Sequence, residues 1–230
     1  MKRVLIKLSG EALANGTEKI YDNSFVDKVA ASLVKCAEEG YQLAVVVGAG
    51  NIWRGREGGD MDRVCADRMG MLATVINALA IQDALERKGV PTRVQTAIDI
   101  IKVAEPYILR KAMSHLNKGR IVIFACGTGN PHFTTDTAAA LRAADINAEV
   151  LLLAKNVDGI YDSDPKKNAN AKKLDKVSYK DYIEQGLKAM DTTAITLCME
   201  NDIKVLAFGL FEEKALMRAI TGENIGTLIE

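Results

Sequence analysis

The feature that most restricts the fold of this chain is a series of short apolar runs, rich in Val, Ile and Leu, with longer helical stretches between them. Most of these runs are continuously apolar rather than alternating, which is typical of strands covered on both faces. The runs are Val4–Leu8, Leu43–Val47, Thr92–Gln95, Ile121–Ala125, Val150–Leu153 and Lys204–Phe208. Because strands and helices alternate, the sequence predicts an α/β fold, a three-layer αβα sandwich with a mainly parallel central sheet.

Helical periodicity fills the segments between the runs. Asn23 or Ser24 is the expected cap of the first long helix, and Gly40 is expected to end it. The other predicted helices are Asp67–Lys88, Glu105–Leu116, Thr135–Ala144, Thr192–Glu200 and Glu212–Ile220. We expect one domain over residues 1–230, and a change of composition near residues 158–176 leaves open a nucleotide-binding lobe from about residue 154 onward.

Charge and composition exclude several classes of protein. Lys plus Arg and Asp plus Glu both number 30, so the chain lacks the basic excess of a nucleic-acid-binding protein. The four cysteines lie in or beside apolar stretches without close pairing, which favours buried free thiols over disulfides or zinc ligands. We find no run of about 18 apolar residues and no leader-like N-terminus, so we expect no membrane span and a cytoplasmic location.

Glycines and small polar residues follow three of the predicted strands. They occur at Ser9-Gly10, at Gly48-Ala49-Gly50 and at Gly127-Thr128-Gly129. Ligands bind at the carboxyl ends of strands in open α/β sheets, and glycine lets backbone amides approach phosphate oxygens there. A single such loop is more often an ordinary turn than a binding site, but three at one sheet edge favour a shared cleft.

The familiar phosphate-binding and nucleophile motifs are absent from the sequence. There is no Gly-Lys dipeptide for a Walker A loop, no third glycine for a dinucleotide fingerprint, and no G-x-S-x-G elbow. A phosphotransferase with this sequence must therefore use a different fold.

Four charged residues are candidates for phosphoryl chemistry, which depends mainly on positive charge around the transferred group. Lys7 lies within an apolar strand, where an ammonium is costly unless it reaches an anion or water; a snorkelling lysine is the alternative. Arg54 follows the second glycine loop and can hold phosphate with two hydrogen bonds. Asp136 suits Mg²⁺ or a helix cap, and Asp164 suits an acidic turn equally well.

Five longer motifs in the sequence are more specific than these single residues. They resemble the bacterial uridylate kinases, a branch of the amino acid kinase family, over nearly the whole chain from residue 3 to Ile229. The matching motifs are Lys7–Glu11, Gly48–Gly55, Asp67–Thr74, Thr128–Asp136 and Val157–Tyr161. The resemblance implies transfer of the γ-phosphoryl group of ATP to UMP, giving UDP and ADP in pyrimidine nucleotide biosynthesis, with Mg²⁺.

The resemblance also implies roles for individual residues. Lys7, Arg54 and Asp136 are the expected catalytic residues, with Asp136 organising Mg²⁺ or the lysine. Asp67 is expected to accept hydrogen bonds from the ribose of UMP, and Asp191 to support the catalytic cluster. The expected ATP-binding residues are Lys7, Leu8, Ser9, Gly10, Gly50, Arg54, Asn156, Tyr161 and Asp164. The expected UMP-binding residues are Ala49, Asp67, Thr128, Gly129, Asn130, Pro131, His132, Phe133, Thr134 and Thr135.

The chain departs from the family pattern in three places. Ala49 replaces a usual glycine and would be strained at positive φ. Lys155 and Asn156 are both candidates for the position beside adenine. Residues 15–22 lack the usual glycine-rich form near the regulatory site of relatives, so GTP activation and UTP inhibition are less firmly implied than catalysis. A homohexamer is implied by the resemblance alone.

Two other functions are consistent with the same residues. One is a kinase of this family that acts on a carboxylate or carbamate, although residues 128–135 offer amides and hydroxyls rather than cations. The other is a nucleotide-binding protein without turnover, against which the presence of Lys7, Arg54 and Asp136 argues.

Overall fold

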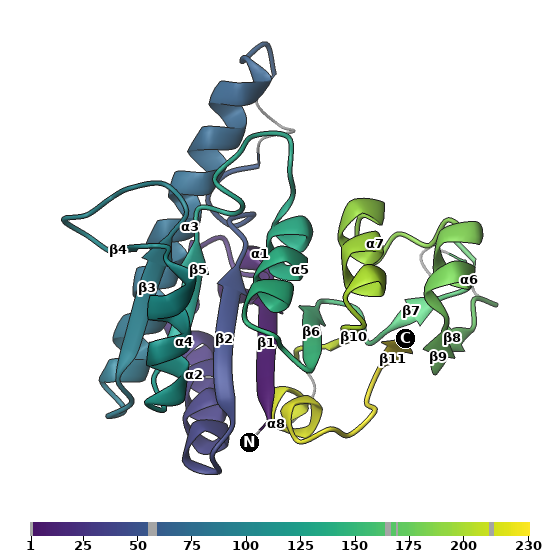
Figure 1. Ribbon diagram of the computed structural model, residues 1–230. Coiled ribbons are helices and arrows are strands. Elements are labelled where there is room, and N and C mark those ends of the chain that lie inside the picture. Colours follow the sequence, from purple (N-terminus) through teal and green to yellow (C-terminus); the bar gives the residue numbers. More distant parts are fainter. Residues whose placement is uncertain (1, 55–58, 164–166, 169, 212–213) are drawn as a thin grey trace.

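A computed structural model describes residues 2–54, 59–163, 167–168, 170–211 and 214–230, and its framework is one nine-stranded sheet (Figure 1). The strands are β1 (Arg3–Leu8), β2 (Gln42–Val47), β3 (Thr92–Thr96), β4 (Glu105–Pro106), β5 (Ile121–Ala125), β6 (Val150–Lys155), β9 (Lys176–Val177), β10 (Lys204–Gly209) and β11 (Thr227–Ile229). Their order is β4-β3-β5-β2-β1-β6-β10-β11-β9, and only the β10–β11 pair among them is antiparallel. The predicted parallel sheet is confirmed.

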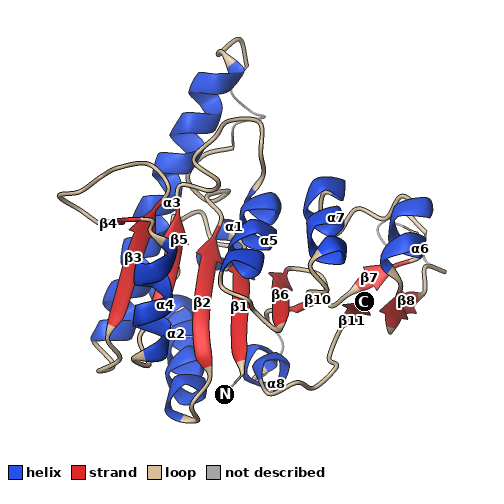
Figure 2. Ribbon diagram, in the orientation of Figure 1, coloured by secondary structure: helices blue, strands red, loops and turns tan. Residues whose placement is uncertain are grey.

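Helices cover both faces of the sheet (Figure 2). On one face lie α1 (Gly10–Ala14), α2 (Asn23–Glu38), α3 (Arg63–Glu86) and α8 (Ala215–Ile220), which pack against Val4, Ile6 and Leu8 of β1. On the other lie α4 (Leu109–Asn117), α5 (Thr135–Asp145), α6 (Tyr179–Glu184) and α7 (Thr192–Glu200), which pack with Leu5 of the same strand. The three-layer αβα sandwich is therefore confirmed.

The predicted ends of several helices were wrong. The cap of α2 is Asp22, whose carboxylate accepts from the amides of Ser24 and Phe25, because a carboxylate one residue earlier reaches both free amides. Gly40, at φ 90°, does follow the end of this helix. The α3 helix begins at Arg63, four residues before the predicted start, because Asp62 caps it through the amide of Cys65.

Two other predicted helices instead begin later than expected. The α4 helix starts at Leu109 because Glu105 and Pro106 pair with β3 as β4. The α8 helix starts at Ala215, and Glu212 of the predicted range lies outside the described residues. The shortest strands and helices were not predicted, because they are too short for a periodic pattern. They are β4, β9, β11, α1, α6 and the hairpin of β7 (Ile160–Tyr161) and β8 (Lys173–Leu174).

One expectation from composition, the burial of all four cysteines, needs correction. All four cysteines are free, but Cys65 is exposed in the first turn of α3, and only Cys36, Cys126 and Cys198 are buried. The α3 helix, at 24 residues, is the one described helix that is long and apolar enough to cross a membrane. Here 44% of that apolar stretch is buried inside the protein, as in the core helix of an α/β domain.

Candidate active site

The ammonium of Lys7 meets a carboxylate at the carboxyl end of β1. Lys7 and Leu5 lie on the same face of this strand, toward α5. The Lys7 Nζ atom is 3.0 Å from Oδ1 of Asp136, and the two side chains are 13% and 19% exposed. A lysine inside an apolar strand is thus explained by a charge partner and not by snorkelling to water.

Asp136 is not the cap of α5. The hydroxyl of Thr134 caps this helix by accepting from the amides of Asp136 and Thr137, at 3.1 and 3.2 Å. The Asp136 carboxylate is therefore free to face Lys7 from the first helical turn, where the helix dipole also favours a negative charge. The capping alternative raised by the sequence is wrong.

The first two glycine loops pack directly against each other. A Cβ atom on Gly10 would lie 2.5 Å from Oδ1 of Asn51 and 2.6 Å from the carbonyl oxygen of Gly48. A Cβ atom on Gly50 would lie 2.8 Å from Oε1 of Glu11. Ala49 is not among the described residues with positive φ, so the strain considered for it does not arise. Glycine is thus required here for close approach of two backbones.

Asn77 holds the second glycine loop in place and was missed by the sequence analysis. It is fully buried on α3, and its amide donates to the carbonyl of Gly48 at 2.7 Å and to Oδ1 of Asn51 at 2.8 Å. The available signal was an amide side chain on the apolar side of a predicted helix, since a buried polar group requires a partner.

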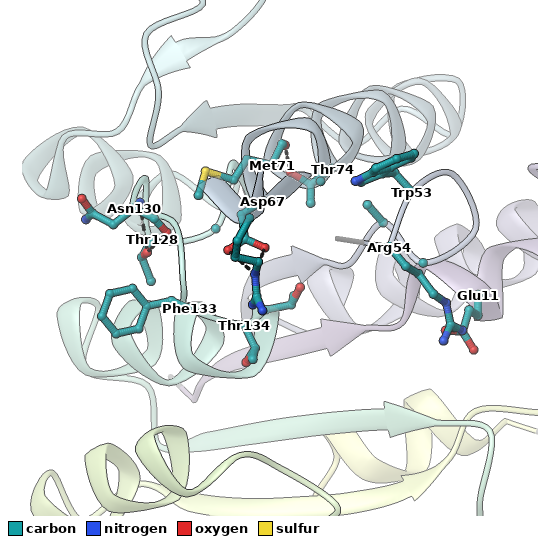
Figure 3. A pocket seen from close by; sticks show the side chains of 16 residues that line it. Glu11, Trp53, Arg54, Asp67, Met71, Thr74, Thr128, Asn130, Phe133 and Thr134 are labelled. Carbon is teal, nitrogen blue, oxygen red and sulfur yellow. Dashed lines mark hydrogen bonds and ion pairs between the residues drawn. The ribbon is translucent and has the colours of Figure 1, made fainter. Parts of the chain in front are cut away.

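A cavity of about 430 Å³ lies between this loop, α3 and the 128–135 segment. Figure 3 shows Arg54 beside Glu11 at one end, Thr128, Asn130 and Phe133 at the other, and Asp67 between them. Arg54 forms an ion pair with Glu11. The lining includes the predicted residues Ala49, Gly50, Arg54, Asp67, Thr128, Asn130, Phe133, Thr134 and Thr135.

Asp67 connects α3 to the 128–135 segment. Its carboxylate accepts from the backbone amide of His132 at 2.8 Å and from Nε of Arg63 at 2.9 Å to each oxygen. Desolvation raises the pKa of Asp67, but the His132 amide and Arg63 outweigh it, and the pKa lies below its usual value. Asp67 is therefore a fixed carboxylate that faces the cavity.

Three residues in or next to the 128–135 segment have positive φ. Gly127 and Gly129 have φ of 59° and 84°, and His132 has φ of 72°. The Thr128 hydroxyl accepts from the amide of Asn130 at 3.2 Å. Of the predicted residues in this segment, Gly129, Pro131 and His132 do not line the cavity, and His132 contributes its amide to Asp67 instead.

Two further cavities continue from the first one. A central cavity of about 560 Å³ shares Thr134 with the first and is lined by Asp136, Lys155 and Asp191. An outer cavity of about 550 Å³ shares Lys155 with the central one and is lined by Tyr161. The three cavities thus form a row along the carboxyl edge of the sheet.

The remaining predicted ATP-binding residues differ in whether they can reach the cavities. The side chain of Leu8 is fully buried in the core, so only its backbone can face a ligand. Ser9 precedes α1 and makes no side-chain cap. Between the two adenine candidates, Lys155 lines the cavities, whereas Asn156 is exposed and lines none of those described. Asp164, like Gly55 of the second motif, lies outside the described residues.

Asp191 links the starts of two helices next to Asp136. Its carboxylate accepts from the hydroxyls of Thr134 and Thr137 and caps α7 through the amide of Ala194 at 2.9 Å. These contacts fix the start of α5, which carries Asp136. Asp191 therefore supports the Lys7–Asp136 pair without facing it directly.

The residues present fit a magnesium ion bound with a nucleotide. No group of three or more metal-ligating side chains occurs within the described part of the chain. Mg²⁺, however, usually needs only one or two carboxylates together with substrate phosphates and water. Apart from its ion pair with Lys7, Oδ1 of Asp136 accepts no hydrogen bond from the described residues. Asp136 is the side chain that would hold the ion.

The sheet edge, the fixed Lys7–Asp136 pair and the row of cavities define a class: α/β phosphotransferases that bind nucleotides without a Walker A loop. Residues 2–208 match the model of the amino acid kinase family. The chain belongs to this family.

Solved structures of UMP kinases are similar to this chain over its whole length. The enzyme from Bacillus anthracis is 40% identical, with a TM-score of 0.96 and coverage of 100% of this chain and 96% of that one. The enzyme from Ureaplasma parvum is 39% identical, with a TM-score of 0.94 and coverage of 100% and 98%. The uridylate kinase from Archaeoglobus fulgidus is 29% identical, with a TM-score of 0.75 and full coverage of both chains.

Proposed function

We propose that this protein is a UMP kinase, which transfers the γ-phosphoryl group of ATP to UMP and releases UDP and ADP. The observation that carries the proposal is the row of three cavities, with Asp136 and Lys7 beside the middle one. Two nucleotides placed end to end in such a row would bring their phosphates together at the central cavity. The similarity to two UMP kinases at 39% and 40% identity supports the same function.

UMP is the substrate for the first cavity. Asp67 accepts hydrogen bonds from the ribose hydroxyls, and the amides and hydroxyls of residues 128–135 suit the two carbonyls and one N–H of uracil. Arg54, at the opposite end beside Glu11, binds the phosphate. Thr134, which lines both cavities, marks where the phosphate of UMP would meet the central cavity.

ATP is the substrate for the outer and central cavities, with Tyr161 beside the adenosine. The γ-phosphoryl group passes in line from ADP to an oxygen of the UMP phosphate, without a covalent intermediate. Lys7 stabilises the charge on the transferred group, and the amides of Ser9, Gly10 and Gly50 bind phosphate oxygens. Asp136 would hold Mg²⁺, which would neutralise further phosphate charge.

The whole chain acts as one amino acid kinase-like domain in this proposal, with the ATP lobe formed by residues from about 154 onward. The expected location is the cytoplasm, in pyrimidine nucleotide biosynthesis. A homohexamer with GTP as activator and UTP as inhibitor is carried over from the resemblance. An exposed apolar stripe on α3, formed by Met69, Leu72 and Ile76 at helical spacing, supports assembly through this helix.

A coupled assay of ADP release tests the function. UMP, CMP, acetylglutamate and aspartate are supplied in turn with ATP and Mg²⁺, with and without GTP. We expect rapid turnover with UMP and little with the two carboxylates. Turnover with a carboxylate substrate instead of UMP, or binding of ATP and UMP without UDP formation, would contradict the proposal.

A further inference from the structure

A second lysine lies on the same face of the sheet as Lys7. Lys155 is the last residue of β6, which pairs in parallel with β1 so that Lys7 lies opposite Leu153. Leu151 and Leu153 face the core under α5 and α7, and side chains alternate along a strand, so Lys155 points to this face as well. Two neighbouring strands therefore present an ammonium group each to the start of α5.

The ammonium of Lys155 donates to the backbone carbonyl of Ala189. That carbonyl belongs to the segment between α6 and α7, which Tyr182 fixes in place. The Tyr182 hydroxyl accepts from the amide of Met190 at 2.7 Å and donates to its carbonyl at 3.0 Å. A carbonyl group satisfies a hydrogen bond but does not neutralise a charge, so this contact leaves the charge of the partly buried Lys155 ammonium uncompensated.

The nearby carboxylates have other partners. Asp136 is paired with Lys7 at 3.0 Å, and Asp191 accepts from two hydroxyls and one amide. Desolvation lowers the pKa of Lys155, Asp136 raises it in part, and the charge of Lys7 lowers it further. Lys7 and Lys155 thus share the influence of one carboxylate, and an additional anion in the central cavity would stabilise both.

We propose that Lys155 is a second catalytic lysine, which binds the γ-phosphoryl group of ATP within the central cavity. The inference rests on the proposed function and extends it. Lys155 lines both the central and the outer cavity, so its ammonium lies where the phosphates of a nucleotide in the outer cavity would enter the central one. The phosphoryl oxygens replace the Ala189 carbonyl as its acceptor.

The transfer step needs no proton from Lys155. An oxygen of the UMP phosphate donates an electron pair to the γ-phosphorus, and the bond from this phosphorus to the β–γ bridging oxygen breaks. The electron pair of that bond stays on the oxygen of ADP. Lys155 remains an ammonium throughout and, together with Lys7, balances negative charge on the transferred group.

The test compares Lys155→Met and Lys155→Arg with the control Lys180→Met. Lys180 is exposed on α6, where it pairs with Glu184, and it lines neither the central nor the outer cavity. Its replacement therefore removes a lysine charge from the same part of the chain without touching the proposed ATP site. We expect Lys155→Met to lower kcat about 100-fold, the effect of removing one preorganised electrostatic group, with the KM for UMP little changed. Lys155→Arg is expected to recover part of this loss, and Lys180→Met to stay near wild type.

Binding measurements separate a phosphoryl contact from a purely structural role. Affinities for ATP and ADP are measured without UMP, so that no transfer occurs. We expect Lys155→Met to weaken ATP about tenfold, as for loss of a charge-assisted hydrogen bond, and to leave ADP nearly unchanged. Equal weakening of both nucleotides would show that Lys155 only fixes the Ala189 segment, and the proposal would be overturned. Thermal melting confirms that each variant is folded.

The outcomes also separate this inference from the proposed function. A wild-type protein that makes no UDP would refute the kinase proposal, while the ATP and ADP affinities would still test Lys155. An active wild type with an equally active Lys155→Met variant would refute the role of Lys155 alone.

Discussion

Nζ of Lys7 and Oδ1 of Asp136 lie 3.0 Å apart and join the end of β1 to the first turn of α5. Both side chains are largely shielded from water, so the contact is stronger than an exposed ion pair. Removal of either partner leaves the other charge uncompensated. The pair therefore positions the lysine when no phosphate is bound, next to Asp136, which lines the central cavity.

Replacement of Lys7 tests its part in turnover. Lys7→Met should lower kcat by about 100-fold to 1,000-fold, because a fixed positive charge next to the transferred group is lost. The KM for UMP should change little, since UMP occupies the first cavity. Steady-state kinetics over a range of UMP concentrations gives both constants, and an unchanged kcat would remove Lys7 from the mechanism.

Replacement of Asp67 should affect UMP binding more than turnover. Asp67→Asn keeps the shape of the side chain but removes the charge that accepts from ribose, so we expect the KM for UMP to rise about tenfold. The matched control is Asp83→Asn. Asp83 forms an ion pair with Arg87, as Asp67 does with Arg63, but it lies near the other end of α3 and does not line the cavity. A large loss of kcat at saturating UMP with unchanged KM would contradict the ribose role.

The cap of α2 should make stability depend on pH. Hydrogen bonds from Asn15 and Ser24 lower the pKa of Asp22 from its usual 3.8 to about 2. A lowered pKa stabilises the folded state above pH 4, and this contribution is lost as the pH falls toward 2. Asp22→Ala should therefore lower the Tm at pH 7. Near pH 2 the Tm of this variant should approach that of the wild type.

The control for this prediction is Asp22→Asn. Asparagine also caps helices but does not titrate in this range, so the variant should keep much of the stability at pH 7. A difference in Tm between wild type and Asp22→Ala that stays constant from pH 7 to pH 2 would show that the charge of Asp22 is not involved.

Two glycine-to-alanine substitutions should shift stability in opposite directions. A Cβ atom on Gly226 would lie 1.9 Å from the carbonyl oxygen of Ala207, so Gly226→Ala forces β10 and β11 apart and should cost about 1–3 kcal/mol. A Cβ atom on Gly70, within α3, would lie 3.7 Å from its nearest neighbour, Cδ1 of Trp53, which is an ordinary van der Waals contact. Gly70→Ala should stabilise the protein by about 0.5–1 kcal/mol. Urea denaturation measures both effects, and a stable Gly226→Ala protein would contradict the close β10–β11 approach.

Periodicity and local chemistry were sufficient for much of the fold. The runs at Ile121–Ala125 and Thr192–Glu200 match β5 and α7 because an apolar pattern over several residues depends only on neighbours in sequence. The ends of α2 and α4 were missed because one cap and one short strand decided them. Such boundaries depend on which single group reaches a free amide or a neighbouring strand.

The candidate site was predicted unevenly. Lys7, Arg54 and Asp136 were selected as charged residues suited to phosphoryl chemistry, and Asp67 was selected from the family resemblance. The structure brings Arg54 and Asp67 to one cavity and pairs Lys7 with Asp136. Asn77 and the orientation of Lys155 were not predicted, since nothing in the local sequence shows what a buried amide or a strand-end lysine faces.

Residue types at short spacing were enough to predict the parallel α/β architecture, the glycine loops at the strand ends and the family of this protein. Three features needed the three-dimensional arrangement: Thr134 rather than Asp136 caps α5, Ala49 is unstrained, and Lys7 and Lys155 lie on one face of the sheet near the same carboxylate. The physical reason is that strand order and register place residues distant in sequence on one face, and charge partners are set by that placement.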